Sequence, residues 1–443
     1  MTKTLVSLFS GALGLDLGLE KAGFVLKAVV ECDPITVETI KGNLANLGIS
    51  KLAVIDEALS LGNVRKVCDG ILEKGGISKS GCCLLAGAPP CQPFSTAGKR
   101  ASLRDVRSCG FEIFLQAVRI LRPKFFVIEN VRGVVSAAKK HRPLAERGPG
   151  FPPLTPDEEH GSAFRELLDS LSELCATMRY CIAWGLVNAA DYGVPQIRER
   201  LLMIGSLDGH FVWPEPTHSR TTQNGQKKWM TLRNALRGLK ESEPSYKEFS
   251  RESSRYLRLI PEGCNWRSLP KNVQGVAIGA AFKSWGGRSG FLRRLSWCTP
   301  APTITSNPKT RATMLCHPTE IRPLSVRECA RLQQFPDDWQ FAGSLSAQYR
   351  QVGNATPVGL GEAVGRAIMK ALRSRRQGAH AGMLLCADAD LLNRIARSPK
   401  TMLNPLRMRK ETGCQDVVPW SNGKPNRRTE FLRYKAIGST RQE

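Results

Sequence analysis

The chain has 443 residues, of which 42% are hydrophobic and 23% are charged, and its formal net charge is +25. This composition is typical of a globular protein of two or three domains, and it excludes both a disordered chain and a fibrous one. No stretch approaches about 18 uninterrupted apolar residues, so we expect no membrane-spanning helix.

The first 24 residues contain an apolar run, and a secretory signal peptide is one interpretation of it. Asp16 and Glu20 interrupt the run, however, and no small-residue cleavage pattern follows. A buried strand over residues 3–9 explains the segment better. The turn Ser10-Gly11-Ala12-Leu13-Gly14 then leads into a helical pattern that ends near Ala22.

Three further short strands are predicted over residues 28–30, 82–86 and 125–128, and a helix over 111–121 precedes the last of them. Strands that alternate with helices predict an α/β fold with a parallel sheet and helices on both faces. Ligands of such sheets bind beyond the carboxyl ends of the strands. We therefore expect Gly11, Glu31, Cys91 and Glu129, which each follow a strand, at one edge of the sheet.

The later predicted elements are a loop at 139–161, strands at 180–187 and 201–205, and helices at 325–335 and 356–371. Ser325 and Glu328 have the spacing of a capping box, which predicts where the first of these helices begins. Pro357 suits the first position of the second helix.

Residues 210–320 lack such periodicity and hold 18 lysines and arginines against 7 acidic residues, while residues 371–443 hold 15 against 6. Concentrated positive charge indicates a polyanionic partner, most often nucleic acid, although a solvated basic surface has the same composition. We predict a catalytic domain formed by 1–209 and 321–372, with an irregular second domain at 210–320. A basic extension of unknown role follows at 373–443.

The extension contains two apolar patches, at residues 383–385 and 417–420, which indicate some folded structure in it.

None of the fourteen cysteines follows the C-x2-C spacing of a zinc site, so we expect no metal and mostly buried, reduced thiols, as in a cytosolic protein. Cys91 differs because Pro89 and Pro90 stiffen the loop before it, at the ligand edge of the sheet. A thiolate at this place is a candidate nucleophile if neighbouring cations lower its pKa. A structural loop cysteine is the alternative.

Glu129 follows four apolar residues of a predicted strand. A carboxyl group at the end of a buried apolar strand can have a raised pKa, because burial disfavours its charged form, and it can then donate a proton. Gln196, Arg198 and Arg200 alternate, so an extended backbone would place all three on one face. Two guanidinium groups on one face suit a phosphate or a carbonyl oxygen. A salt-bridged surface strand, with Glu199 opposed, is the alternative.

With these motifs in order, the chain resembles the DNA (cytosine-5)-methyltransferases, particularly those of bacterial restriction-modification systems. The resemblance runs from Leu5 to about Ala371. The motifs that carry it, in the family's order, are Phe9-Ser10-Gly11, Glu31, Pro90-Cys91-Gln92, Glu129-Asn130-Val131, Gln196-x-Arg198-x-Arg200, Arg322-Pro323-Leu324-Ser325-x-x-Glu328 and Gly353-Asn354-Ala355. Leu13 and Ala88 stand where the family usually has Gly, and Val358 where Pro is frequent. None of these departures removes a reacting group.

The resemblance implies a Rossmann-like sheet, S-adenosylmethionine as cofactor, and transfer of a methyl group to carbon 5 of a cytosine flipped out of duplex DNA. Cys91 would attack carbon 6 as a thiolate, and Glu129 would hold or protonate ring N3. Arg200 would steady the O2 oxygen, with Arg198 supporting it. The mechanism needs no metal.

The resemblance also implies a set of cofactor-binding residues. These are Phe9, Ser10, Gly11, Ala12, Gly14, Glu31, Asp56, Pro89, Asn354 and Ala355. Phe9 would lie close to the adenine, Glu31 at the ribose and Asn354 near the methionine end. Asp56 is the preferred third acidic contact, and Glu57 is the alternative.

Residues 210–320 match the family's target-recognition region, which would read the DNA. The predicted DNA-binding residues are Gln92, Ser95, Arg288, Arg293, Arg294, Thr305, Lys309 and Arg311.

Three other hypotheses for the function remain open: the same chemistry on a transfer RNA, a non-catalytic DNA-binding protein that keeps the fold, and a nicotinamide dehydrogenase. The last is poorly supported because the G-x-G-x-x-G pattern is missing. We expect a bacterial, cytoplasmic, nucleoid-associated monomer that acts on double-stranded DNA, with a restriction endonuclease as a separate partner.

Overall fold

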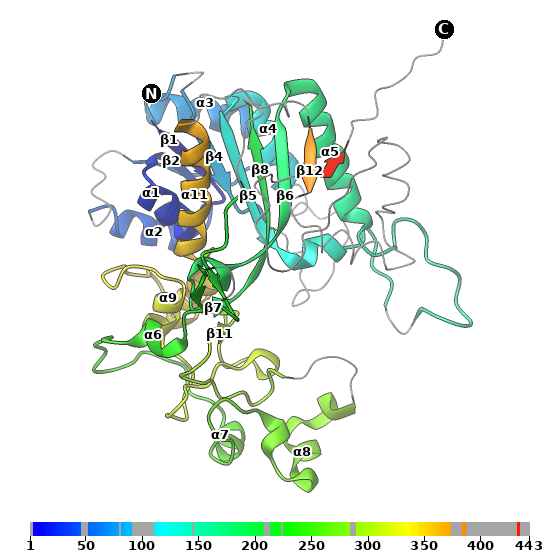
Figure 1. Cartoon of the computed structure of the whole chain (residues 1–443), viewed down its shortest axis with the longest axis vertical. Coiled ribbons are helices and arrows are strands. Elements are labelled where there is room, and N and C mark those ends of the chain that lie inside the picture. Colours follow the sequence, from blue (N-terminus) through cyan, green and yellow to red (C-terminus); the bar gives the residue numbers. More distant parts are fainter. Residues whose placement is uncertain are drawn as a thin grey trace.

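The protein is described here by a computed structural model. It covers residues 3–45, 52–78, 81–90, 110–143, 146–207, 213–222, 225–283, 289–373 and 383–386, and the backbone of 432–434. Figure 1 shows a sheet with its helices in the upper part of the molecule and a smaller, irregular part below, which carries α7 and α8.

The sheet has nine strands in the order β13-β12-β6-β8-β5-β4-β1-β2-β3. The strands are β1 (Thr4–Leu8), β2 (Val25–Glu31), β3 (Ala53–Asp56), β4 (Leu84–Gly87), β5 (Phe125–Val131), β6 (Cys181–Asn188), β8 (Glu199–Ser206), β12 (Leu384–Cys386) and β13 (Leu432–Tyr434). The predicted α/β fold is confirmed, and every strand predicted from the sequence is present within a few residues of its expected bounds.

The sheet is not wholly parallel, which corrects the prediction. β1, β2, β3, β4 and β5 pair in parallel with one another, whereas β8 runs antiparallel to both β5 and β6. Residues 189–198 join β6 to β8 with only a short 3-10 turn, Ala189–Tyr192. A parallel connection needs a crossover of about a dozen residues or more, so this short link forces an antiparallel pair.

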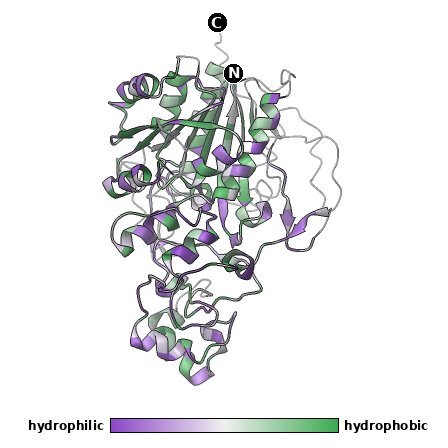
Figure 2. Cartoon of the chain, turned by 90° about the vertical axis from the view of Figure 1, so that its left-hand side faces the viewer, coloured by the Kyte–Doolittle hydropathy of each residue, from purple (hydrophilic) through white to green (hydrophobic). Residues whose placement is uncertain are grey.

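Successive side chains of each strand enter two different apolar clusters, one on each face of the sheet. In β5, Phe125 and Val127 belong to one cluster, and Phe126 and Ile128 belong to the other. This alternation is why the central strands read as continuous apolar runs in the sequence. Figure 2 shows the strands in the hydrophobic colour between helices that carry both colours.

Helices cover both faces. The helices of the upper part are α1 (Gly14–Lys21), α2 (Pro34–Gly42), α3 (Val64–Lys74), α4 (Gly110–Leu121), α5 (Ser162–Met178), α10 (Leu345–Asn354) and α11 (Val358–Arg373). Residues of α1 and α11 lie in one cluster, and residues of α3, α4 and α5 lie in the other. α2, α3, α5, α10 and β3 were not among the predicted elements, although Leu167, Leu171 and Leu174 have helical spacing in α5.

The lower part has a separate, smaller apolar cluster that includes Leu257, Trp266, Ile278 and Met314. Its helices are α6 (Leu232–Leu236), α7 (Arg251–Leu257) and α8 (Lys271–Ile278). β11 (Ala301–Pro302) pairs with β7 (Gln196–Ile197), so backbone hydrogen bonding joins this part to the segment that precedes β8.

The chain after Leu372 contributes to the sheet. β12 pairs in parallel with β6, which confirms the folded structure predicted for residues 383–385. The second apolar patch, 417–420, lies outside the described residues.

The predicted capping box is confirmed at α9 (Val326–Leu332), where Ser325 and Glu328 bond reciprocally. Within the described residues, no helix is both long and apolar enough to cross a membrane.

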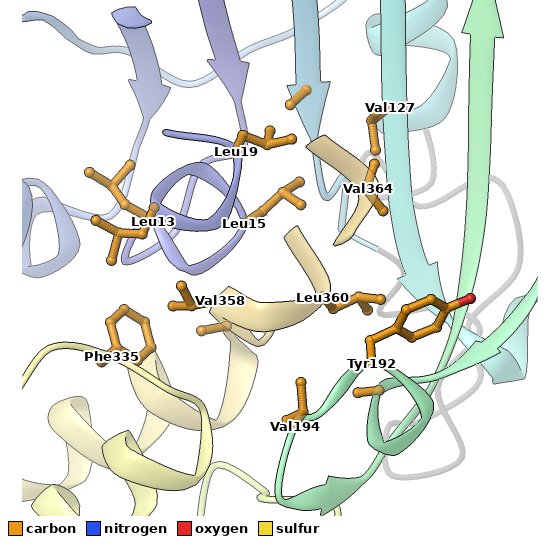
Figure 3. Close-up of a cluster of buried hydrophobic side chains, with 14 of the residues drawn as sticks. Leu13, Leu15, Leu19, Val127, Tyr192, Val194, Phe335, Val358, Leu360 and Val364 are labelled. Atoms are coloured by element: carbon orange, nitrogen blue, oxygen red, sulfur yellow. The ribbon is translucent and has the colours of Figure 1, made fainter. Parts of the chain in front are cut away.

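Helices α1 and α11 touch through their backbones. A Cβ atom on Gly18 would lie 2.1 Å from the carbonyl oxygen of Val358, and one on Gly361 would lie 2.4 Å from that of Leu15. Figure 3 shows the side chains that flank this contact, among them Leu15, Leu360 and Val364.

We expect Gly18→Ala to destabilise the protein by about 1–3 kcal/mol, because the new methyl group would force two backbones apart. Gly70→Ala in α3 is the matched control, since a Cβ there meets no atom within 4 Å, and the same change in an open helix position stabilises by roughly 0.5–1 kcal/mol. Urea unfolding of both variants measures the difference. Equal stability of the two would contradict the close contact.

Candidate active site

A cavity of about 420 Å³ lies beyond the carboxyl ends of β1, β2 and β4, where an α/β sheet is expected to bind its ligand. Its wall is formed by the turn after β1, the first turn of α1, the ends of β2 and β4, and the end of α10. The lining residues include Phe9, Ser10, Gly11, Ala12, Gly14, Glu31, Asn354 and Ala355, all from the predicted cofactor set.

The turn after β1, which lines the cavity, contains three residues with positive φ angles. Phe9, Gly11 and Leu13 have φ angles of 53°, 53° and 66°, which lie in the left-handed region. Gly11 adopts this conformation without a Cβ clash, whereas Leu13 is a departure from the family's usual glycine. The Leu13 side chain is buried in the cluster of Figure 3, and this packing offsets the backbone strain.

The Glu31 side chain, at the end of β2, connects the turn after β1 to that strand by hydrogen bonding. One carboxylate oxygen accepts a hydrogen bond from the Gly11 backbone N–H at 2.8 Å, and the other accepts from Cys32 and Asp33 at 2.8 and 2.9 Å. Three backbone donors therefore hold the Glu31 carboxylate at the cavity wall.

Two members of the predicted cofactor set do not line the cavity. Glu57 does so instead of Asp56, and Pro90 instead of Pro89. β3 ends at Asp56, and the cavity begins beyond the strand ends, so the following residue is the one that reaches it. Pro89 instead accepts a hydrogen bond from the Asn130 side chain through its carbonyl at 3.0 Å.

Glu129 and Arg200 form a buried ion pair, with Arg200 Nε 2.7 Å from Glu129 Oε1. They come from the neighbouring antiparallel strands β5 and β8, where Val131 lies opposite Arg200. Asn130, which follows Glu129 within β5, donates a hydrogen bond to the Pro89 carbonyl, and Pro90 lines the cavity. The predicted residues Cys91, Gln92 and Ser95 lie outside the described residues.

The alternation predicted for residues 196–200 is confirmed. Gln196, Arg198 and Arg200 are 0%, 1% and 8% exposed, while Ile197 is 41% exposed. Glu199 lies on the other side and pairs with Arg132 at 2.5 Å.

The Arg198 side chain is buried and contacts backbone carbonyl groups instead of a cavity. Its guanidinium donates to the carbonyls of Ile304, Gly353 and Ala355 at 2.8, 2.9 and 3.0 Å. Complete burial, together with neighbouring Arg200, lowers the pKa of Arg198, and Glu129 opposes this effect. Arg198 therefore ties the lower part of the chain to the segment that follows α10.

The predicted DNA-binding arginines of the lower part are mostly engaged within the protein. Arg294 donates to the carbonyls of Ile260, Pro318 and Thr319, and Arg293 donates to that of Met314. Burial lowers the pKa of Arg293 to about 10.

The other predicted residues of this set differ in accessibility. Arg311 is exposed with one hydrogen bond, to the Ala277 carbonyl, and the Lys309 side chain is exposed. The Thr305 hydroxyl donates to the Asn307 carbonyl. Arg288 lies outside the described residues.

Ser7 and Asp16 are two residues of the cavity that were not predicted from the sequence. Both line the cavity, and each is 1% exposed. The pattern at Asp16, a carboxylate inside an apolar run, was the available signal. Burial raises the pKa of Asp16 to about 7, with Glu20 adding to the rise and Ser7 opposing it.

The cavity is acidic. Its described lining residues include the four carboxylates of Asp16, Glu31, Asp33 and Glu57 and a single guanidinium, that of Arg350. No group of three or more His, Cys, Asp or Glu side chains is arranged for a metal ion in the part of the chain that the structure describes.

Comparisons with known proteins agree on one family. The model of the family described as C-5 cytosine-specific DNA methylase matches residues 3–370. The Type II methyltransferase M.Eco47II of Escherichia coli is 32% identical over 83% of this chain and 79% of its own length. The Type II methyltransferase M.Sau96I of Staphylococcus aureus is 32% identical over 82% of this chain and 74% of its own.

Among solved structures, a DNA modification methyltransferase encoded within an E. coli prophage has the same fold, with a TM-score of 0.53 and 23% identity. The match covers 84% of this chain and 99% of that one.

We expect Asp16→Asn to stabilise the ligand-free protein at neutral and higher pH. The pKa of Asp16 is about 7 in the folded state and 3.8 when unperturbed, so the folded state binds the proton more tightly. Ionisation therefore destabilises the wild type progressively from about pH 4 to above pH 7, by as much as roughly 4 kcal/mol.

Urea unfolding of both proteins across this range measures the effect. The stability difference should grow with pH and vanish near pH 4, and a difference that is independent of pH would contradict the pKa assignment.

Proposed function

The chain belongs to the C-5 cytosine-specific DNA methylase family, and from this premise we propose that it is the modification enzyme of a restriction-modification system. It transfers a methyl group from S-adenosylmethionine to carbon 5 of a flipped-out cytosine in a specific duplex sequence, in the bacterial cytoplasm. The observation that carries the proposal is the buried Glu129–Arg200 pair on β5 and β8, because β5 neighbours β4 and the end of β4 lines the acidic cavity.

The charge of the cavity supports S-adenosylmethionine over a nicotinamide dinucleotide. A pyrophosphate would meet several carboxylates and one guanidinium, whereas a sulfonium compound with an ammonium group finds opposite charge. Phe9 suits the adenine, Glu31 the ribose and Asn354 the methionine end, and Glu57 replaces Asp56 as the third acidic contact. When bound, the cofactor supplies an activated methyl group.

The protein's own groups prepare the cytosine for methylation. The Cys91 thiolate adds to carbon 6, and Glu129 hydrogen-bonds or protonates N3, so that charge pushed into the ring is stabilised. Arg200 supports the O2 oxygen and keeps Glu129 oriented through their 2.7 Å contact. A base then removes the proton from carbon 5, and Cys91 leaves.

Arg198 is proposed as a positioning residue. All the hydrogen bonds of its guanidinium within 3.0 Å go to backbone carbonyls of Ile304, Gly353 and Ala355, so it acts on the site through the segments that it holds. This narrows the catalytic role expected from the sequence.

Residues 210–320 are proposed to recognise the target sequence. The exposed side chains of Lys309 and Arg311 are available for phosphate or guanine contacts, whereas Arg293 and Arg294 support the fold of this region. A cognate endonuclease would act separately on the same sequence.

Cys91→Ala should abolish methyl transfer, and Glu129→Gln should slow it by about 100- to 10,000-fold, because a general acid contributes that much. Cys298→Ala, at an exposed cysteine of the lower part, is the control and should keep full activity. The measurement is tritium release from cytosine labelled at carbon 5, with DNA and transfer RNA supplied in parallel. Activity retained by Cys91→Ala, or seen on transfer RNA alone, would overturn the assignment.

Lys309→Ala should weaken DNA binding about equally for all sequences and reduce the salt dependence of the binding constant by about one charge, as expected for a phosphate contact. Arg294→Ala should chiefly lower thermal stability, since it leaves three backbone carbonyls without their donor. Binding titrations at several salt concentrations and thermal unfolding separate the two effects. If Arg294→Ala weakened DNA binding and left thermal stability unchanged, Arg294 would be a DNA contact as predicted from the sequence.

A further inference from the structure

Asp16 stands apart from the other acidic groups of the cavity. Glu31 accepts three backbone hydrogen bonds, Asp33 pairs with Arg350 at 3.3 Å, and Glu57 accepts from Asn63 at 3.1 Å. Neither oxygen of Asp16 makes a hydrogen bond within the described residues.

Ser7 is a second buried polar residue of the cavity, and it lies on a different element from Asp16. Its hydroxyl, on β1, is buried, lines the same cavity and also lacks a hydrogen bond among the described residues. Ser7 lies close enough to Asp16 to lower its pKa by hydrogen bonding, but the two side chains do not reach good hydrogen-bond geometry. Two elements therefore present to one cavity three oxygens that lack a well-formed hydrogen bond within the described residues.

Buried polar atoms without a partner are rare and destabilise a protein, so such a cluster indicates a ligand group that satisfies it. The first turn of α1, in which Asp16 lies, offsets only part of the penalty through the helix dipole. A partner that carries positive charge and several donors satisfies the ionised carboxylate and the hydroxyl oxygen together.

We propose that Asp16, assisted by Ser7, binds the α-ammonium group of the methyl donor. The proposal rests on the proposed function, which supplies S-adenosylmethionine as the ligand. An ammonium group has three donors and a full charge, which match two carboxylate oxygens and a hydroxyl oxygen. The sulfonium of the same molecule donates no hydrogen bond, and the adenine amino group is neutral.

The position of Asp16 agrees with this assignment. Gly14, two residues earlier, packs against Ala355 and Thr356, where a Cβ would lie 2.2 Å from the Thr356 carbonyl oxygen. The first turn of α1 therefore adjoins the Asn354 segment, which the proposed function places at the methionine end. Glu31, proposed for the ribose, is on a different element, at the end of β2.

The test compares three ligands that differ in the groups concerned. S-adenosylmethionine has both the ammonium and the sulfonium, S-adenosylhomocysteine keeps only the ammonium, and 5′-methylthioadenosine has neither. Asp16→Asn should weaken binding of the first two by a similar factor, about 10- to 100-fold, and leave that of the third unchanged. Ser7→Ala should weaken the first two by a smaller factor. Calorimetric titration of the full-length chain measures each dissociation constant.

Asp69→Asn is the matched control, because it makes the same substitution at an exposed position of α3 outside the cavity wall and should leave all three affinities unchanged. The higher stability expected of ligand-free Asp16→Asn ensures that weaker binding does not reflect unfolding.

Each alternative outcome has a distinct meaning. Unchanged affinity of Asp16→Asn for S-adenosylmethionine overturns the proposal, and a loss confined to that ligand assigns Asp16 to the sulfonium instead. An equal loss for 5′-methylthioadenosine shows a general disturbance of the cavity and also overturns it. If the wild type binds none of the three, the proposed function itself fails.

Discussion

The backbone contact between α1 and α11 is the constraint on which the rest of the site depends. Gly18 and Gly361 let the two helices approach until carbonyl oxygens occupy the space of a side chain. The contact joins the N-terminal turn to the segment around Asn354, more than three hundred residues later, and both line the same cavity. A cofactor site divided between the two ends of a domain requires a contact of this kind, because neither segment encloses a ligand alone.

The protein combines two opposite electrostatic environments. Its net charge of +25 favours a polyanion at long range, whereas carboxylates dominate the lining of the cavity. The positive net charge and the acidic lining do not cancel, because charges in solvent are screened beyond about 8 Å at physiological salt. The electrostatic potential inside a partly enclosed cavity is set by the charged groups that line it. The basic surface therefore suits DNA, and the acidic cavity suits a cationic methyl donor.

Burial separates the arginines of this chain into different roles. Arg198 and Arg294 donate their hydrogen bonds to backbone carbonyls and so connect separate segments of the chain. Arg200 instead pairs with the Glu129 carboxylate at the predicted reaction site. All three belong to basic motifs that look alike in the sequence. A guanidinium bound by three carbonyls has few donors left for a phosphate, so the hydrogen-bond partners decide the role.

The α/β fold, most strands, the capping box before α9 and the family could be predicted from the sequence, because they depend on local periodicity and on motif order. The strand pattern also placed Glu31 at the end of β2 and Gly11 just after β1, whereas Glu129 lies within β5, two residues before its end, and not after the strand as expected. Other features follow from the tertiary structure alone: β8 is antiparallel, Glu57 lines the cavity instead of Asp56, and Asp16 is buried. These features depend on which groups lie nearby in space, and residues distant along the chain supply those groups.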